Sequence, residues 1–204
     1  MARNFLATLL SPSALREQER YYGRSRPVTP DGPGDPLGER EAEFIAARDS
    51  FYMATVGEAG WPYVQHRGGP AGFLRVVTPT RLAFADYGGN RQLLTAGNLA
   101  VDDRVSLFLM DYAHRRRLKI LGHARVADVR EHPELREGLA VEDGAEVERV
   151  VVIDVVSFDW NCPQHITERF TRAEVEAAVE PLYREIDRLR ALVGEGGSQR
   201  PQGD

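Results

Sequence analysis

The sequence FYMATVGEAGWPYVQH, residues 51–66, decides the class of fold. Residues 51–56 and 61–66 are both rich in aromatic and β-branched side chains, and the four residues between them include two glycines. Two such runs around a short glycine-containing loop predict a β-hairpin, whose strands are antiparallel. The central region of the chain is therefore expected to begin with antiparallel pairing.

Outward from this hairpin, five more short strands follow with little helix between them. They are expected at residues 72–77, 81–85, 104–110, 117–129 and 149–158. Short helices are expected at 90–99 and 132–140. A doubly wound sheet would alternate strands and helices regularly, so this order argues against one. We expect a mainly β protein of the α+β class, built as a small closed barrel with helices packed on it.

Helices are expected at both ends of the chain. At the N-terminal end, Ser11-Pro12 has the residue types of a helix cap and first helical residue, and a second helix is expected over 39–48. Between them, eight of the sixteen residues 23–38 are glycine or proline, which predicts a loop or arm.

At the C-terminal end, Thr171 and Glu174 have the spacing of a capping box, and apolar residues then recur at helical spacing as far as Val193. This helix is long enough to cover a partner as well as its own barrel. We therefore expect an N-terminal arm at 1–50, a barrel domain at 51–170, a C-terminal helix at 171–193 and a frayed tail at 194–204.

Composition argues against several classes of protein. The 204 residues carry a formal net charge of −5, whereas nucleic-acid binding usually needs a basic face. The one cysteine, Cys162, rules out an intramolecular disulfide and a cysteine-based zinc site, and it fits a reducing compartment, so we expect a cytoplasmic protein. No apolar run approaches the roughly 20 residues of a membrane-spanning helix. The short apolar stretch near the N-terminus is expected to be buried.

Common catalytic motifs are absent from the sequence. It has no Walker A loop, no Gly-x-Gly-x-x-Gly after a strand and no Gly-x-Ser-x-Gly. The five histidines include no His-x-x-x-His pair, so we expect no metal site. No acid–base pair or nucleophile stands out, and the catalytic residues stay unassigned.

The strongest local candidate for a site is Asp-Tyr-Gly-Gly-Asn-Arg-Gln at residues 86–92, between a predicted strand and a predicted helix. Gly88 and Gly89 allow a sharp turn, and Asn90 is placed as the helix N-cap. A helix start with Arg91 in its first turn favours a phosphate group. An ordinary strand-to-helix turn with an exposed arginine explains the same residues equally well.

The basic run Arg-Arg-Arg-Leu-Lys at 115–119 is a second candidate. Strand alternation places Arg117 and Lys119 on one face, opposite Leu118 and Ile120. Such a cationic face could hold an acidic group of a ligand, or it could be a solvated strand surface.

Two loops complete the set of candidates. The glycine-rich stretch 66–76 brings a backbone with few side chains close to the start of a strand, which suits a flat ring or a simple bulge. The stretch 158–166 crowds Trp160, Gln164 and His165 into a loop after a strand. Such a loop can form a pocket wall, or it can cap the strand over a buried tryptophan.

Taken in order, these features resemble the pyridoxamine 5′-phosphate oxidase-like FMN-binding split barrels. The triplet Asn90-Arg91-Gln92 is similar to the phosphate clamp Ser-Arg-Lys of that family, and Trp160–Ile166 is similar to the signature of a subgroup of uncharacterised relatives. The resemblance is carried by residues 51–64, 70–76, 82–92, 104–110 and 117–122.

The resemblance implies a homodimer that holds FMN in a groove between its subunits. In that groove Arg91 and Gln92 would hold the phosphate with Arg75 close by, Phe73 and its neighbours would lie along the isoalloxazine ring, and Arg117 would lie near the ring or the phosphate. The full set of implied cofactor contacts is Arg67, Ala71, Gly72, Phe73, Arg75, Asp86, Asn90, Arg91, Gln92, Arg117, Trp160 and Asn161. A substrate wall is implied for Gln164 and His165.

The sequence departs from the family pattern at two positions of the clamp region. Gln92 stands where lysine is usual, and Asp86 stands where threonine is usual. The phosphate site therefore lacks one of the positive charges that the family supplies.

The function implied is an FMN-dependent oxidoreductase with a small-molecule substrate, for which NAD(P)H is a candidate reductant. The flavin carries the electrons, so the protein needs to supply only binding and orientation. The alternatives are a non-catalytic flavin or haem carrier or sensor on the same barrel, and a purely structural β-barrel. Neither nucleic acid nor a membrane is expected as a partner.

Pyridoxamine 5′-phosphate itself is not the expected substrate. The oxidases of the family end in a strand with an Arg-x-His clamp for the substrate phosphate, and no Arg-x-His follows Ile166 here. Instead, the chain passes through Arg169 into the predicted C-terminal helix. The alternative is that Arg169 and His165 together replace the clamp from another direction.

Overall fold

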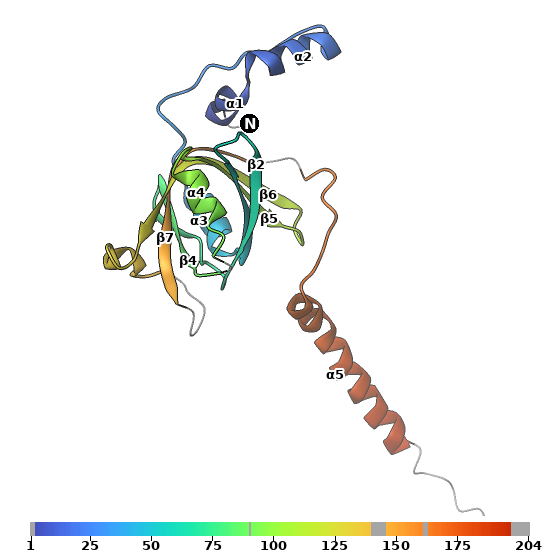
Figure 1. Ribbon diagram of the computed structural model, residues 1–204. Coiled ribbons are helices and arrows are strands. Elements are labelled where there is room, and N and C mark those ends of the chain that lie inside the picture. Colours follow the sequence, from blue (N-terminus) through green and yellow to red (C-terminus); the bar gives the residue numbers. More distant parts are fainter. Residues whose placement is uncertain (1–2, 90, 140–145, 161–162, 197–204) are drawn as a thin grey trace, which may run out of the picture. The chain divides into compact units, whose positions relative to one another are not determined.

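The structure, a computed structural model, describes residues 3–89, 91–139, 146–160 and 163–196 (Figure 1). The chain forms two compact units. One unit comprises Met1–Asp111 and Arg115–Ile166, and the other comprises Tyr112–His114 and Thr167–Asp204. Two of the predicted site residues, Asn90 and Asn161, and also Cys162, lie outside the described residues.

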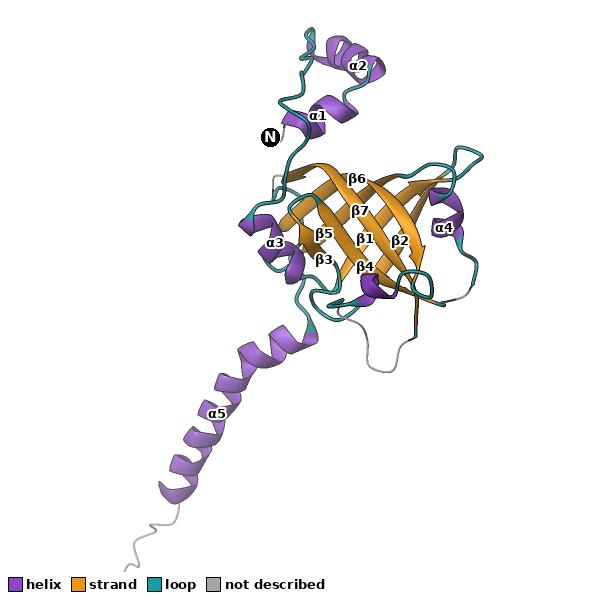
Figure 2. Cartoon of the chain, turned by 90° about the vertical axis from the view of Figure 1, so that its left-hand side faces the viewer, coloured by secondary structure: helices purple, strands orange, loops and turns teal. Residues whose placement is uncertain are grey.

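The first unit is built on one seven-stranded antiparallel sheet in the order β2-β1-β5-β6-β7-β4-β3 (Figure 2). Its strands are β1 (Ser50–Val56), β2 (Pro62–Gly68), β3 (Arg75–Thr78), β4 (Arg81–Tyr87), β5 (Arg104–Asp111), β6 (Arg116–Asp128) and β7 (Val147–Trp160). The prediction of a mainly β protein with an antiparallel hairpin at 51–66 is confirmed.

The expectation of a fully closed barrel is wrong, because the sheet keeps two edges. In the described residues, β2 pairs only with β1, and β3 pairs only with β4. The burial of β2 gives the physical reason. Its residues are alternately exposed and half-buried and none is buried, so this strand is not enclosed by the core. The sheet is a split barrel.

The core lies on the inner face of the curled sheet. Alternate residues of β1 and β5 point into it, and the rings of Phe51, Phe73 and Phe84 pack together there. On β6, Leu118 and Ile120 are buried, whereas Arg117 and Lys119 are half-buried on the opposite face. The predicted alternation of this strand is therefore confirmed.

Short helices flank the sheet of this unit. They are α1 (Arg3–Leu9), α2 (Pro12–Tyr22), α3 (Glu39–Ala46) and α4 (Leu94–Leu99), and the helix expected at 132–140 is a single 3-10 turn at Pro133–Arg136. Figure 2 shows α3 and α4 at opposite ends of the sheet. The apolar N-terminal stretch is helical, with Asn4 and Phe5 buried. The amide of Asn4 donates to the carboxylate of Asp35 at 2.8 Å and so ties the glycine- and proline-rich arm to α1.

The helix expected at 90–99 begins four residues late, at Leu94. Arg91 and Leu93 adopt positive φ angles of 60° and 53°, which an α-helix cannot contain. The expectation that Arg91 lies in the first turn of this helix is therefore wrong.

The second unit contains α5 (Arg172–Gly196). The predicted capping box is confirmed: the backbone N–H of Thr171 donates to Glu174 Oε2 at 2.7 Å, and the N–H of Glu174 donates to Thr171 Oγ1 at 3.2 Å. Pro181 lies within the helix. Among the described residues, no helix is both long and apolar enough to cross a membrane. Most of the expected frayed tail, residues 197–204, lies outside the described part of the chain.

Candidate anion-binding cleft

A cleft of about 300 Å³ opens beside β2, β4 and the loop that leads into α4. We call it the anion cleft and define it by the residues that line it. These are Tyr63, Gln65, Arg67, Asp86, Tyr87, Gly88, Gly89, Arg91, Gln92, Leu93, Leu94, Thr95, Ala96 and Arg149. Polar and charged side chains dominate the wall, and the cleft contains the strongest candidate stretch of the sequence.

Three charged side chains from three strands meet in this cleft. Asp86 on β4 lies opposite Arg149 on β7 in the antiparallel register, and Arg67 reaches them from β2. Asp86 Oδ1 accepts a hydrogen bond from Arg67 Nη1 at 2.7 Å, and Asp86 Oδ2 accepts one from Arg149 Nε at 2.9 Å. One carboxylate therefore holds two guanidinium groups.

This charge cluster is mostly buried. The side chains of Arg67, Asp86 and Arg149 are 19%, 13% and 17% exposed, so solvent screens their attraction only weakly. Burial, the largest single contribution, lowers the pKa of Arg149. The hydrogen bonds and attraction of Asp86 and Glu148 together outweigh it and raise that pKa above its ordinary value. Arg149 therefore remains a cation in the cleft.

The remaining contacts fix the orientation of each guanidinium. Arg67 Nη2 donates to Thr95 Oγ1 at 2.9 Å. Arg149 Nη1 donates to Glu148 Oε2 at 2.6 Å, and its Nη2 donates to the carbonyl oxygen of Tyr87 at 3.2 Å. The buried Nε of Arg67 has no hydrogen-bond partner among the described residues. A guanidinium has five N–H groups, so both arginines retain donors beyond these contacts.

The loop of the cleft needs glycine for two different reasons. A Cβ atom on Gly88 would lie 2.7 Å from Glu148 Oε1, so a side chain there would displace a partner of Arg149. Gly89 has a φ angle of 48°, in the left-handed region that other residues rarely adopt. The two glycines bring the backbone close to the charge cluster and let the chain turn towards Arg91.

The structure brings four of the predicted site residues together in the anion cleft: Arg67, Asp86, Arg91 and Gln92. It also adds Arg149, which the sequence did not single out. Only the register of β4 with β7 places Arg149 opposite Asp86, and a single sequence does not reveal that register.

Other predicted residues lie outside the lining of this cleft. Phe73 is 3% exposed and stacks on Phe51 with ring centroids 5.4 Å apart, so its ring faces the core. Ala71 and Gly72 lie in the turn before it, where Gly72 has a φ angle of 82°. Arg75 donates to the carbonyl oxygen of Glu137 at 2.9 Å.

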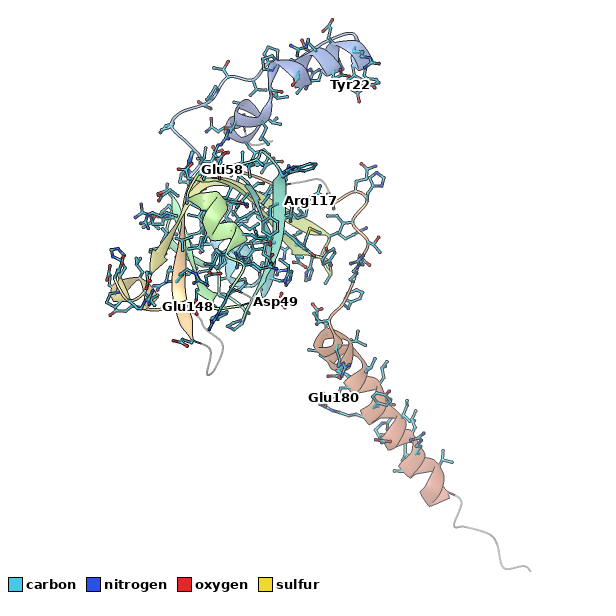
Figure 3. The ribbon with its side chains drawn as sticks, viewed as in Figure 1. Tyr22, Asp49, Glu58, Arg117, Glu148 and Glu180 are labelled. Carbon is cyan, nitrogen blue, oxygen red and sulfur yellow. The ribbon has the colours of Figure 1, made fainter. Side chains whose placement is uncertain are left out.

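Arg117 and Trp160 also lie apart from the cleft lining. Figure 3 labels Arg117 and Glu148, the neighbour of Arg149, at well separated places on the barrel. The guanidinium of Arg117 lies 5.2 Å from the ring centroid of Phe108, and its buried Nε has no partner among the described residues. Trp160 Nε1 donates to Glu41 Oε1 at 2.6 Å.

The expected substrate wall, Gln164 and His165, is exposed, and His165 has a φ angle of 65°. Among the described residues, no group of three or more histidine, cysteine, aspartate or glutamate side chains could hold a metal ion.

The fold and the cleft together define the class of this protein. It is an antiparallel split barrel with a cleft lined by arginine side chains beside the edge strand β2. A family model described as pyridoxamine 5′-phosphate oxidase matches residues 37–159, more than half of the chain and nearly all of the barrel. The chain belongs to the pyridoxamine 5′-phosphate oxidase family.

Several solved structures are similar to this chain. HupZ of Group A Streptococcus is 13% identical with a TM-score of 0.46, and the match covers 66% of this chain and 99% of HupZ. A putative pyridoxamine 5′-phosphate oxidase from Lactobacillus delbrueckii is 20% identical with a TM-score of 0.44, covering 61% of this chain and 93% of that one.

A Clostridium acetobutylicum protein related to general stress protein 26 is 13% identical with a TM-score of 0.46, and the match covers 67% and 94% of the two chains. No curated protein sequence matches this chain.

Proposed function

We propose that this chain is an FMN-dependent oxidoreductase and that the anion cleft holds the phosphate of the flavin. The observation that carries the proposal is the pair of mostly buried arginines, Arg67 and Arg149, held side by side by Asp86. Guanidinium groups bind phosphate through paired, charge-assisted hydrogen bonds. The family generally binds flavin, and this supports the choice of ligand.

The residues present fit a phosphate group. Arg67 donates two and Arg149 three of their five N–H groups within the chain, so both guanidiniums retain donors for phosphate oxygens. Arg91 and Gln92 line the same cleft and would add contacts from the loop before α4. When bound, FMN would supply the electron-transfer chemistry, and the protein would supply binding and orientation.

Arg149 accounts for the two departures from the family pattern. Gln92 lacks the charge of the usual lysine, and Arg149 lines the same cleft with a guanidinium. Asp86, in place of the usual threonine, accepts a hydrogen bond from Arg149 and so holds that guanidinium at the cleft wall. We infer that Arg149 supplies guanidinium donors in place of the lysine ammonium and that Asp86 is its positioning residue, whose carboxylate offsets the charge that Arg149 adds.

FMN is proposed rather than FAD because the anion cleft is small and the sequence offers one phosphate-binding turn. The volume of the cleft is about 300 Å³, and the sequence has no second glycine-rich turn for a pyrophosphate. Mass spectrometry of the cofactor released from the purified protein tests this directly. FMN is the expected result, and FAD or the absence of any flavin would overturn it.

A homodimer is part of the same proposal. Arg117 and Trp160 do not line the anion cleft of their own chain, and the family resemblance places the flavin in a groove between two subunits. Light scattering at micromolar concentration is expected to give the mass of two chains, and a monomer mass would contradict the dimer.

Reduction of the bound flavin by NAD(P)H distinguishes an enzyme from a non-catalytic carrier built on the same barrel. An oxidoreductase is expected to be yellow as purified and to bleach when NAD(P)H reduces its flavin. A protein whose flavin stays oxidised under NAD(P)H, or one with a haem absorption band, would favour the non-catalytic alternative. A colourless protein would contradict both.

Pyridoxamine 5′-phosphate remains an unexpected substrate. The residues after Ile166 lead into α5, and the clamp strand of the oxidases has no counterpart in that stretch. Oxidase assays with pyridoxamine and pyridoxine phosphates are expected to show negligible turnover. Turnover near the roughly 10 s⁻¹ typical of enzymes would refute this expectation.

A further inference from the structure

The C-terminal helix α5 carries an apolar stripe that its own unit leaves uncovered. No side chain of residues 172–193 is buried, and Leu182 and Val193 are 62% and 76% exposed. The stripe consists of six residues separated by four, three, four, three and four positions. They are Val175, Val179, Leu182, Ile186, Leu189 and Val193. An apolar surface of this length on a helix calls for a partner.

The spacing is that of a coiled-coil seam. Alternating steps of four and three give an average period of 3.5 residues, which keeps the stripe facing one partner helix along its whole length. In heptad terms Val179, Ile186 and Val193 occupy a positions, and d positions are occupied by Val175, Leu182 and Leu189. Pro181 falls at a c position, so its ring lies outside the seam, but an interior proline removes one backbone hydrogen bond and kinks the helix. The longest uninterrupted part of the seam is therefore Leu182–Val193.

The choice of residues within the seam specifies its geometry. All three a positions are β-branched, and two of the three d positions are leucine. In parallel coiled coils, β-branched residues at a with leucine at d favour two strands over three or four. The partner that fits this seam is therefore another helix with the same heptad pattern. A second copy of this chain provides such a helix.

The flanking charges complement each other in that arrangement. Glu185 lies at a g position, and Arg190 lies at the e position of the following heptad. In a parallel pair these two positions on opposite helices are neighbours, and symmetry forms the pair twice. Within its own helix each side chain has a nearby ion partner: Glu185 lies 2.7 Å from Arg188, and Arg190 lies 3.5 Å from Asp187.

We propose that α5 pairs with α5 of a second copy of this chain as a parallel two-stranded coiled coil. The seam spans roughly 27 Å at 1.5 Å per residue, under three heptads. A helix pair this short is marginal by itself, so it acts in addition to other contacts between the copies. The proposal does not depend on the flavin, and a colourless dimer would leave it intact.

Disulfide trapping in the full-length chain tests both the pairing and its direction. In a Cys162→Ser background, Leu189→Cys places a thiol at a d position, where two parallel helices bring identical residues together. Ala191→Cys, at the solvent-facing f position, is the matched control. Under mild oxidation Leu189→Cys is expected to form a covalent dimer at least tenfold faster than Ala191→Cys.

Two outcomes would overturn the proposal. Equal trapping rates for the two variants would mean that the disulfides form through random collisions between chains. Leu189→Cys that stays uncrosslinked would mean that α5 binds elsewhere or pairs antiparallel, since an antiparallel pair sets Leu189 opposite Val179. Gel filtration and flavin content of each variant confirm that the barrel is intact.

Charge reversal sharpens the same test. Glu185→Arg sets like charges against Arg190 of the other helix and is expected to slow trapping of Leu189→Cys by roughly two- to fivefold, as for exposed ion pairs. Adding Arg190→Glu is expected to restore the rate. The control is the double variant Glu180→Arg with Arg184→Glu, which reverses an ion pair within one helix away from the seam and leaves the rate unchanged. A failure of restoration would contradict the parallel pairing.

Discussion

Arg67 and Arg149 of the anion cleft differ from Arg75 and Arg117, two predicted site residues outside it, in how many contacts hold them. Arg67 and Arg149 together donate five hydrogen bonds to protein groups, and both bind the same carboxylate, Asp86. Arg75 donates one bond, to a backbone carbonyl group, and Arg117 stacks on a ring with its buried Nε left without an acceptor in the described part of the chain. The first pair is fixed in place by its own chain.

This difference shows which of these guanidinium groups are held in place by contacts within a single chain. A preorganised guanidinium loses little entropy when an anion arrives, so the cleft is ready to bind. The buried Nε of Arg117, in contrast, has no hydrogen-bond acceptor among the described residues. A ligand or a second chain can supply one. The comparison predicts that changes to Arg67, Asp86 and Arg149 weaken binding or folding, whereas changes at Arg75 and Arg117 have small or opposite effects.

The largest expected effect comes from removing the shared carboxylate. Asp86→Leu leaves Arg67 without its counterion and Arg149 with only Glu148, and the apoprotein is expected to lose about 3 kcal/mol of unfolding free energy, the low end for breaking a buried pair. Urea denaturation followed by circular dichroism measures this loss.

A matched control exists on the same sheet. Asp154 pairs with Arg81 at 2.6 Å, but both side chains are about half exposed, so Asp154→Leu is expected to cost less than 1 kcal/mol. Equal losses in the two variants would show that the cleft cluster is no more than a surface ion pair.

The next effect concerns flavin affinity. Arg67→Met removes a phosphate contact and is expected to weaken FMN binding by about 1.5–3 kcal/mol, the range for a hydrogen bond to a charged group. Arg75→Met, which removes the same charge outside the cleft, is expected to change the Kd less than twofold. Quenching of flavin fluorescence on binding gives both constants. A larger loss for Arg75→Met would place the phosphate elsewhere.

The elements of the fold could be predicted from the sequence because their patterns are local. The alternation Arg117-Leu118-Lys119-Ile120 and the capping box at Thr171 involve residues close in sequence, and both were correctly predicted. The start of α4 could not be predicted, because non-glycine residues such as Arg91 rarely adopt a positive φ angle and the sequence carries no sign of it.

The candidate site was predictable only in part, for a related reason. The loop residues Asp86, Arg91 and Gln92 are neighbours in the sequence and resemble a family motif. Arg149 joins them through pairing of β4 with β7, between residues more than sixty positions apart. Arg149 is a charged residue at the start of a strand rich in β-branched residues, and this sequence context is also typical of an ordinary surface position.

A smaller effect of opposite sign is expected at Arg117. Arg117→Met keeps an apolar stem against Phe108 and removes a buried donor that lacks a partner. The apoprotein is therefore expected to gain about 1 kcal/mol of unfolding free energy, the lower cost of an unsatisfied buried group. Thermal or urea unfolding of the flavin-free protein measures it, and a clear loss of stability would mean that Arg117 already has a partner within the apoprotein.

The smallest expected effect is a gain in affinity from restoring the usual residue of the family clamp. Gln92 lines the anion cleft and is exposed, so Gln92→Lys adds a positive charge at a solvent-screened position. FMN binding is expected to tighten by only about 0.2–1 kcal/mol, as for an exposed ion pair, and the gain should shrink as salt is added. Gln164→Lys makes the same charge change outside the cleft and is expected to leave the Kd unchanged. If Gln92→Lys instead tightened binding a hundredfold, the phosphate site would be short of a cation, and Arg149 would not be its second one. A gain that is small and sensitive to salt is what a cleft already supplied by Arg67 and Arg149 should show.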